Sequence, residues 1–272
     1  MYSDFIAFGS SGVHYCRWGT GSKILLCFHG YGESAQSFAL LEEALGARFT
    51  IVAIDLPFHG STDWKEGLFL KPADLLSLIG DVVAGLPGED GPWWLLGYSM
   101  GGRVALRLLE LVPEKVARLV LLAPDGLTLN PWYWLATQTG PGNLFFRWTM
   151  RHPQWFFSFL RLGNALKAVN PSVYKFTRQH IGDRRVRHDL YTRWTTMRGF
   201  RPHLRRIQAI ISERQVPVRI LYGRFDRIIR KDAGERFREG GIGDHCRLTI
   251  LPTGHQLLQP GNVPAILRSL ED

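Results

Sequence analysis

A serine between two glycines, placed where an apolar strand turns directly into a helix, constrains this chain more than any other feature. Residues 95–102 read Leu-Leu-Gly-Tyr-Ser-Met-Gly-Gly, and apolar residues at helical spacing follow from Val104. So sharp a turn strains the Ser99 backbone and exposes its hydroxyl, and Gly97 and Gly101 make room because they lack a Cβ. The Met100 N–H then points, from the positive end of a helix, at whatever Ser99 attacks. An ordinary βα turn with a polar residue is the alternative interpretation.

The pattern around this turn predicts a doubly wound α/β fold. Ser3–Phe8 and Val13–Trp18 alternate apolar and polar residues around Gly9-Ser10-Ser11-Gly12, which indicates an antiparallel hairpin. Continuous apolar runs, typical of parallel strands covered on both faces, follow at residues 24–28, 50–54, 93–96, 119–122, 218–222 and 247–251. Helical patterns lie between them at Ser34–Leu45, Pro72–Leu86, Met100–Leu111, Asp232–Arg238 and Pro260–Leu270. We therefore expect a mostly parallel, eight-stranded sheet that begins with an antiparallel hairpin.

The alternation of strands and helices stops after the sixth strand and resumes at Pro217. This predicts a core of residues 1–124 and 217–272 and a helical cap inserted at 125–216. The insertion holds fifteen Lys and Arg residues against four acids, so it carries the excess of a chain whose net charge is +9. No nucleic-acid recognition motif accompanies this charge, and we expect no nucleic-acid partner.

A serine hydroxyl is a weak nucleophile at neutral pH and needs a base that a carboxylate orients. In a parallel sheet of this kind the acid and the histidine follow later strands, in the order Ser, acid, His. Asp226 and His255 each stand one short loop past a predicted strand, in that order. Asp125 also follows a strand end and is the alternative acid, although Asp125-Gly126 suits the turn into the insertion. Each residue alone is commonly a turn or surface residue, but three at three strand ends favour a catalytic triad.

An oxyanion site needs a second donor beside the Met100 N–H. The loop His29-Gly30-Tyr31-Gly32-Glu33 follows the first parallel strand, and its glycines permit close approach of the backbone. The Tyr31 N–H is the expected donor, whereas His29 is expected to brace the loop.

These motifs together resemble the α/β-hydrolase fold superfamily, of the serine-nucleophile type with a helical cap after the sixth strand. The matching residues are His29-Gly30-Tyr31-Gly32, Asp55–Ser61, the turn at Ser99, Gly223-Arg224-Phe225-Asp226 and Gly254-His255. The resemblance implies Ser99 as nucleophile, His255 as base, Asp226 as its partner, and Tyr31 and Met100 as backbone donors. Phe58 departs from the family pattern, which commonly has glycine there. The lack of a His-x4-Asp arrangement at 255–260 argues weakly against acyltransferase activity.

The sequence therefore favours a serine hydrolase that cleaves a small carboxylic ester or thioester through an acyl-enzyme, with no metal or organic cofactor. A carbon–carbon bond hydrolase with the same triad, and a non-catalytic ligand-binding protein, remain alternatives. The insertion holds 15 of the 33 aromatic residues. They either pack the cap or form a pocket, for which Phe58, Tyr98, Trp132 and Trp134 are the candidate substrate-binding residues. The arginines of the cap would then hold an anionic group or contact an anionic lipid surface.

Targeting signals and cysteines bear on the location of the protein. The three cysteines, Cys16, Cys27 and Cys246, are odd in number and far apart, which favours reduced thiols and a cytosolic setting. Neither a signal peptide nor an apolar stretch long enough to cross a bilayer is recognisable. We therefore expect a cytoplasmic protein.

Overall fold

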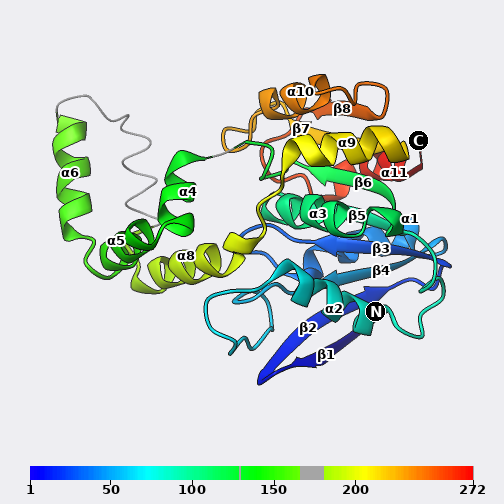
Figure 1. Ribbon diagram of the computed structural model, residues 1–272, viewed down its shortest axis with the longest axis horizontal. Helices are drawn as coiled ribbons and strands as arrows, with labels where there is room; N and C mark the ends of the chain where they lie inside the picture. Colours follow the sequence, from blue (N-terminus) through cyan, green and yellow to red (C-terminus); the bar gives the residue numbers. More distant parts are fainter. Residues whose placement is uncertain (129, 166–180, 272) are drawn as a thin grey trace. The chain divides into compact units, whose positions relative to one another are not determined.

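An eight-stranded mixed sheet forms the centre of the protein, as predicted (Figure 1). The computed structural model describes residues 1–128, 130–165 and 181–271. The strand order is β1-β2-β4-β3-β5-β6-β7-β8, in which β1 pairs antiparallel with β2 and β2 antiparallel with β4, and the remaining pairs are parallel. The strands are β1 Tyr2–Phe8, β2 Ser11–Trp18, β3 Lys23–Phe28, β4 Phe49–Ile54, β5 Trp93–Tyr98, β6 Val116–Leu122, β7 Val218–Gly223 and β8 Cys246–Leu251.

Helices cover both faces of this sheet, as the continuous apolar strands require. Leu96 and Tyr98 of β5 face a buried cluster that also contains residues of the 3-10 helix η1 (Ala35–Leu41), of α1 (Glu42–Leu45) and of α11 (Val263–Glu271). Side chains alternate along a strand, so Gly97 faces the other side, where the backbone of α3 (Met100–Leu111) lies against it. Helices α2 (Pro72–Val83) and α9 (Leu204–Arg214) flank α3. The remaining elements of this region are η2 Pro113–Lys115, α10 Asp232–Glu239 and η4 Pro260–Asn262.

Two elements differ from the sequence prediction. The helix expected over Ser34–Leu45 is mostly the 3-10 helix η1, followed by the single turn α1. Ala35, Phe38 and Leu41 are all fully buried, and their spacing of three residues matches the three residues per turn of a 3-10 helix. Strand β8 was expected to be covered on both faces, but it is the edge of the sheet, and Ile250 is 41% exposed.

The described residues form two compact units. The first comprises Met1–Glu66, Leu70–Thr128 and residues 199–271, and it includes the whole sheet together with α9. The second comprises Gly67–Phe69 and Leu129–Arg198. It contains the helices α4 Pro131–Gln138, α5 Gly140–Arg151, α6 Gln154–Ala165 and α8 Arg184–Thr196, and η3 (Met197–Gly199) follows α8 at the boundary. The limits of the cap inferred from the sequence, 125–216, remain a prediction.

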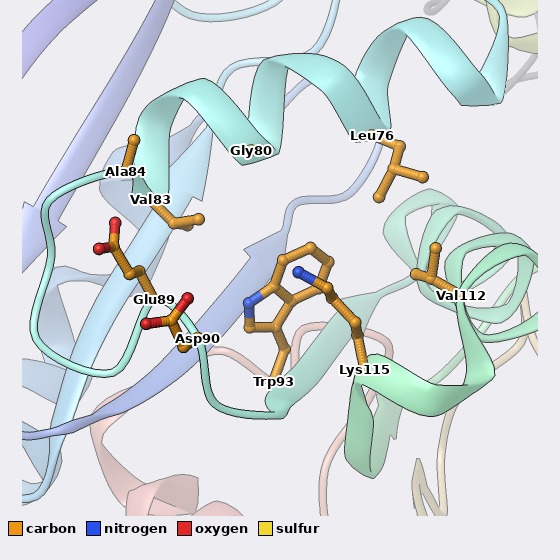
Figure 2. A pocket seen from close by; sticks show the side chains of 9 residues that line it. All are labelled: Leu76, Gly80, Val83, Ala84, Glu89, Asp90, Trp93, Val112 and Lys115. Atoms are coloured by element: carbon orange, nitrogen blue, oxygen red, sulfur yellow. The ribbon is translucent and has the colours of Figure 1, made fainter.

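A surface pocket of about 350 Å³ opens at the amino end of β5, between α2 and the segment that follows α3 (Figure 2). Trp93 forms one wall, and the ammonium group of Lys115 lies 5.2 Å from the centre of its ring. Glu89 and Asp90 line the rim. Ser99 follows the opposite end of β5, so this pocket is separate from the site described next.

Candidate active site

The turn between β5 and α3 holds Ser99 in a conformation that few residues adopt. Its φ of 49° and ψ of −114° fall outside the regions favoured by residues with a side chain. Such strain costs about 1–3 kcal/mol and persists only where the surroundings impose it. The two flanking glycines allow the backbone of strand and helix to approach this closely. A Cβ on Gly101 would stand 1.9 Å from the carbonyl oxygen of Phe28, and a Cβ on Gly97 would stand 2.6 Å from the carbonyl oxygen of Gly101. The predicted strained turn is therefore present.

The structure brings His255 and Asp226 to this serine. His255 Nε2 lies 3.1 Å from Ser99 Oγ, and His255 Nδ1 lies 2.7 Å from Asp226 Oδ2. The Asp226 side chain is fully buried, and its Oδ1 accepts hydrogen bonds from the N–H groups of Ile228 and Ile229 at 2.7 and 3.0 Å. Oδ1 is thus occupied by two backbone donors, and Oδ2 accepts the Nδ1 proton of His255. This leaves Nε2 as the acceptor for the hydroxyl proton of Ser99.

Asp125, the alternative acid, has other partners. Its carboxylate pairs with the guanidinium of Arg103, and its N–H donates to the carbonyl oxygen of Ser99 at 2.9 Å. It therefore supports the backbone of the turn, while Asp226 is the carboxylate that contacts His255.

The loop after β3 borders the serine, as the sequence suggested. A Cβ on Gly30 would stand 3.3 Å from Ser99 Cβ, closer than most such contacts, so the absence of a side chain at Gly30 leaves room beside the serine. His29 is buried and accepts the Leu56 N–H at Nε2 (3.0 Å), so its Nδ1 carries the proton and donates to the Gly30 carbonyl oxygen at 2.8 Å. His29 thus braces the loop. Tyr31 directly follows Gly30 in the sequence, and Met100 directly follows Ser99. Their roles as oxyanion donors remain predictions.

One network of hydrogen bonds joins the three loops of the site. The hydroxyl of Tyr98, on β5, lies 3.2 Å from the carbonyl oxygen of His255 and 2.9 Å from Gln256 Oε1. Gln256 Nε2 donates in turn to Glu33 Oε1 at 3.1 Å. Burial, with the nearby carboxylates of Glu33 and Asp226, raises the pKa of Tyr98, so the phenol stays protonated. The sequence analysis assigned no role to Gln256 or Glu33, although Gln256 directly follows His255 and Glu33 ends the loop at residues 29–33.

The other predicted substrate-binding residues lie in both units. Phe58 is half-buried and has a φ of 63°, a conformation that explains why glycine is common at this position in the family. Trp132 and Trp134 belong to α4 of the second unit, and Trp132 is 79% exposed. Substrate binding by these residues and by Tyr98 remains a prediction.

A second hydrogen-bonded series of Ser, His and Asp side chains occurs outside this site. Ser3 Oγ lies 2.8 Å from His14 Nε2, and His14 Nδ1 lies 2.7 Å from Asp55 Oδ2. Asp55 also accepts the N–H groups of Ala35 and Ser61 at 2.6 and 2.8 Å, so it ties the hairpin to two loops. Ser3 lies within strand β1 and not at the start of a helix, and nothing in its surroundings corresponds to the turn at Ser99. We interpret these hydrogen bonds of Ser3, His14 and Asp55 as stabilising the fold and not as a catalytic site.

Across residues 1–128, 130–165 and 181–271, no three His, Cys, Asp or Glu side chains gather as metal ligands would. Over the same ranges, no helix has both the length and the apolar character needed to cross a bilayer.

The sheet order, the strained serine turn and the inserted helices define an α/β-hydrolase fold. More specifically, the chain belongs to the serine aminopeptidase S33 family, whose sequence model matches residues 20–259.

Individual relatives match parts of the chain. It is 36% identical over 121 residues to the dihydrolipoyllysine-residue acetyltransferase component of the acetoin cleaving system of Pseudomonas putida, a match that covers 43% of this chain and 32% of that protein. It is 32% identical over 107 residues to an esterase of Mycobacterium tuberculosis, covering 39% and 34%. The chain thus spans about a third of the length of the curated relatives it matches.

Solved structures extend the likeness to the whole fold. The thioesterase domain from the curacin biosynthetic pathway superimposes with a TM-score of 0.62 at 20% identity, covering 100% of this chain and 99% of that one. At this identity the match concerns the fold alone.

Proposed function

We propose that the protein is a serine hydrolase that cleaves a carboxylic ester or thioester through an acyl-enzyme on Ser99. The observation that carries this proposal is the placement of His255 between the Asp226 carboxylate and the strained Ser99 hydroxyl. The esterase among the relatives supports the substrate class.

In the proposed reaction, Ser99 Oγ attacks the carbonyl carbon of the substrate while its proton passes to His255 Nε2. Asp226 stabilises the imidazolium that forms, and the N–H groups of Met100 and Tyr31 stabilise the oxyanion of the tetrahedral intermediate. The carbon–oxygen or carbon–sulfur bond then breaks, and the leaving group takes the proton from His255. Water attacks the acyl-Ser99 ester, again with His255 as the base, and the carboxylic acid leaves as Ser99 recovers its proton.

The test is a comparison of p-nitrophenyl esters and acyl-coenzyme A thioesters of matched chain length. The wild type is expected to release p-nitrophenol or thiol in a burst, and acid quenching should trap the acyl group on the peptide that contains Ser99. His255→Ala should retain its fold, measured by circular dichroism, and lose both the burst and the trapped acyl group. Steady turnover of either substrate by Ser99→Ala would contradict the proposal. A diketone substrate in the same series tests carbon–carbon cleavage by the same triad.

A further inference from the structure

Helices α5 and α6 present large apolar side chains to solvent. Figure 1 shows the two helices following one another in the second unit. Among the side chains that the structure describes on these helices, five large apolar ones are exposed, and we call them the aromatic face: Leu144, Phe145, Trp148, Trp155 and Phe159. Their side chains are 37–64% exposed. A soluble domain rarely exposes so many adjoining apolar side chains unless they meet a partner.

Three rings of the aromatic face form one compact group. The ring centres of Phe145 and Trp148, one turn apart on α5, are 5.9 Å apart, and those of Phe145 and Trp155 are 5.4 Å apart. Trp148 and Trp155 are also stacked, at 5.9 Å. The group therefore joins the two helices into a single apolar surface, since its rings contact each other across the bend between them.

Besides contacting one another, these rings take no part in the contact between α5 and α8. The opposite side of α5 faces α8, where Phe146 contacts the rings of Tyr191 and Trp194 at 5.5 and 5.8 Å. Asn143, on that same side, bonds to Tyr191 and Thr195. The side of α5 that carries Leu144, Phe145 and Trp148 thus points away from this contact.

Charge identifies the partner. Arg147, Arg151 and Arg161 are exposed on the same two helices, and none of residues 126–182 is Asp or Glu, whereas six are Lys or Arg. Exposed Trp and Phe side chains beside cations, with acids absent, are typical of helices that lie in the interface of an anionic bilayer. A second copy of the chain fits less well, because a symmetric contact would bring two cationic faces together with no acid from residues 126–182 between them.

We propose that the aromatic face and its flanking arginines bind the surface of an anionic lipid bilayer, with the rings at the level of the headgroups. Binding is peripheral: α5 and α6 have twelve residues each, too few to span a bilayer. The surface lies within the second unit, so the inference does not depend on the proposed reaction at Ser99.

The experiment measures co-sedimentation of the full chain with vesicles of phosphatidylcholine, alone or mixed with phosphatidylglycerol. The wild type should bind the phosphatidylglycerol vesicles at least tenfold more tightly than the neutral ones, and added salt should weaken that binding. The double variant Phe145→Ala/Trp148→Ala should bind the phosphatidylglycerol vesicles about tenfold more weakly, or weaker still. Phe5→Ala is the matched control, since Phe5 is 55% exposed against 53% for Phe145 and lies on β1 of the first unit.

Charge is tested separately from the rings. Arg147→Gln/Arg151→Gln should also reduce binding at least tenfold, whereas Arg205→Gln/Arg214→Gln, which removes the same charge from α9, should change it less than twofold. Ser99→Ala should bind as the wild type does, so a failure of catalysis and a failure of lipid binding are distinguishable. Circular dichroism verifies the fold of every variant.

Three results would overturn the inference. Equal binding to neutral and anionic vesicles would exclude the charge argument, and absence of binding by the folded wild type would exclude the surface altogether. A wild-type dimer that Phe145→Ala/Trp148→Ala converts to a monomer would show that a second copy covers the aromatic face.

Discussion

Replacing Asp226 by asparagine is expected to invert the tautomer of His255 while leaving the fold intact. The N–H groups of Ile228 and Ile229 donate to Asp226 Oδ1 at 2.7 and 3.0 Å, so the amide oxygen of Asp226→Asn stays at that position. The amide nitrogen then takes the position of Oδ2 and donates to His255 Nδ1. His255 consequently carries its proton on Nε2, where it donates to Ser99 Oγ and is unable to accept the hydroxyl proton.

The wrong tautomer in a Ser-His-Asp site costs about 10⁴ in kcat. At about 1.4 kcal/mol per tenfold change, this raises the barrier by roughly 5 kcal/mol. Initial rates with p-nitrophenyl butyrate should show this loss in kcat with little change in KM. The control is Asp125→Asn, which removes the charge of the alternative acid, and we expect it to retain kcat within about tenfold because Asp125 pairs with Arg103.

Either of two outcomes would refute this reasoning. A loss of less than tenfold in folded Asp226→Asn would show that the tautomer of His255 does not control the reaction. A larger loss in Asp125→Asn than in Asp226→Asn would assign the acid role to Asp125.

Three further predictions concern the surroundings of the site, the buried charge and the thiols. Tyr98→Phe keeps the ring beside His255 and removes two hydrogen bonds, so kcat should fall about fivefold to tenfold with KM unchanged, as steady-state kinetics would measure; no change would exclude a positioning role. Burial raises the pKa of Glu110, but hydrogen bonds and charge from Arg107 and His203 outweigh it, so the pKa lies below its usual 4.5. The ionised Glu110 carboxylate therefore stabilises the folded state fully above pH 4.5, and this stabilisation is lost as the pH falls through the lowered pKa. Glu110→Gln should lower the free energy of unfolding by about 1–3 kcal/mol at pH 7 and by progressively less below pH 4.5. Urea titration at each pH measures this difference. Burial raises the pKa of the thiols of Cys16, Cys27 and Cys246. A disulfide reagent should therefore react with none of them before the protein unfolds, and reaction in the native state would contradict their burial.

The parts of the fold that follow from local pattern were predictable. Alternation at Ser3–Phe8 and Val13–Trp18 predicted the hairpin, and continuous apolar runs from residue 24 onward predicted the parallel strands. In β2 and the central parallel strands, burial on one or both faces leaves a direct record in the sequence, whereas β1 has no buried residue. The 3-10 helix at Ala35–Leu41 was expected as an α-helix, since apolar residues three apart suit either helix over two turns.

The candidate site was predictable to the extent that strand ends mark it. Asp226 and His255 stand directly after strands, and the structure brings both to Ser99. The bonds from Tyr98 to Gln256 and from Gln256 to Glu33 join residues more than 150 positions apart. No local pattern records such pairs, because they depend on how the ends of β3, β5 and β8 meet.

The most direct test of an activated Ser99 is labelling with a fluorophosphonate, followed by mass spectrometry of the peptides. The account predicts one labelled peptide, which contains Ser99, and loss of the label in Ser99→Ala and in His255→Ala. Folded wild type that takes up no label, or label on another serine such as Ser3, would contradict it.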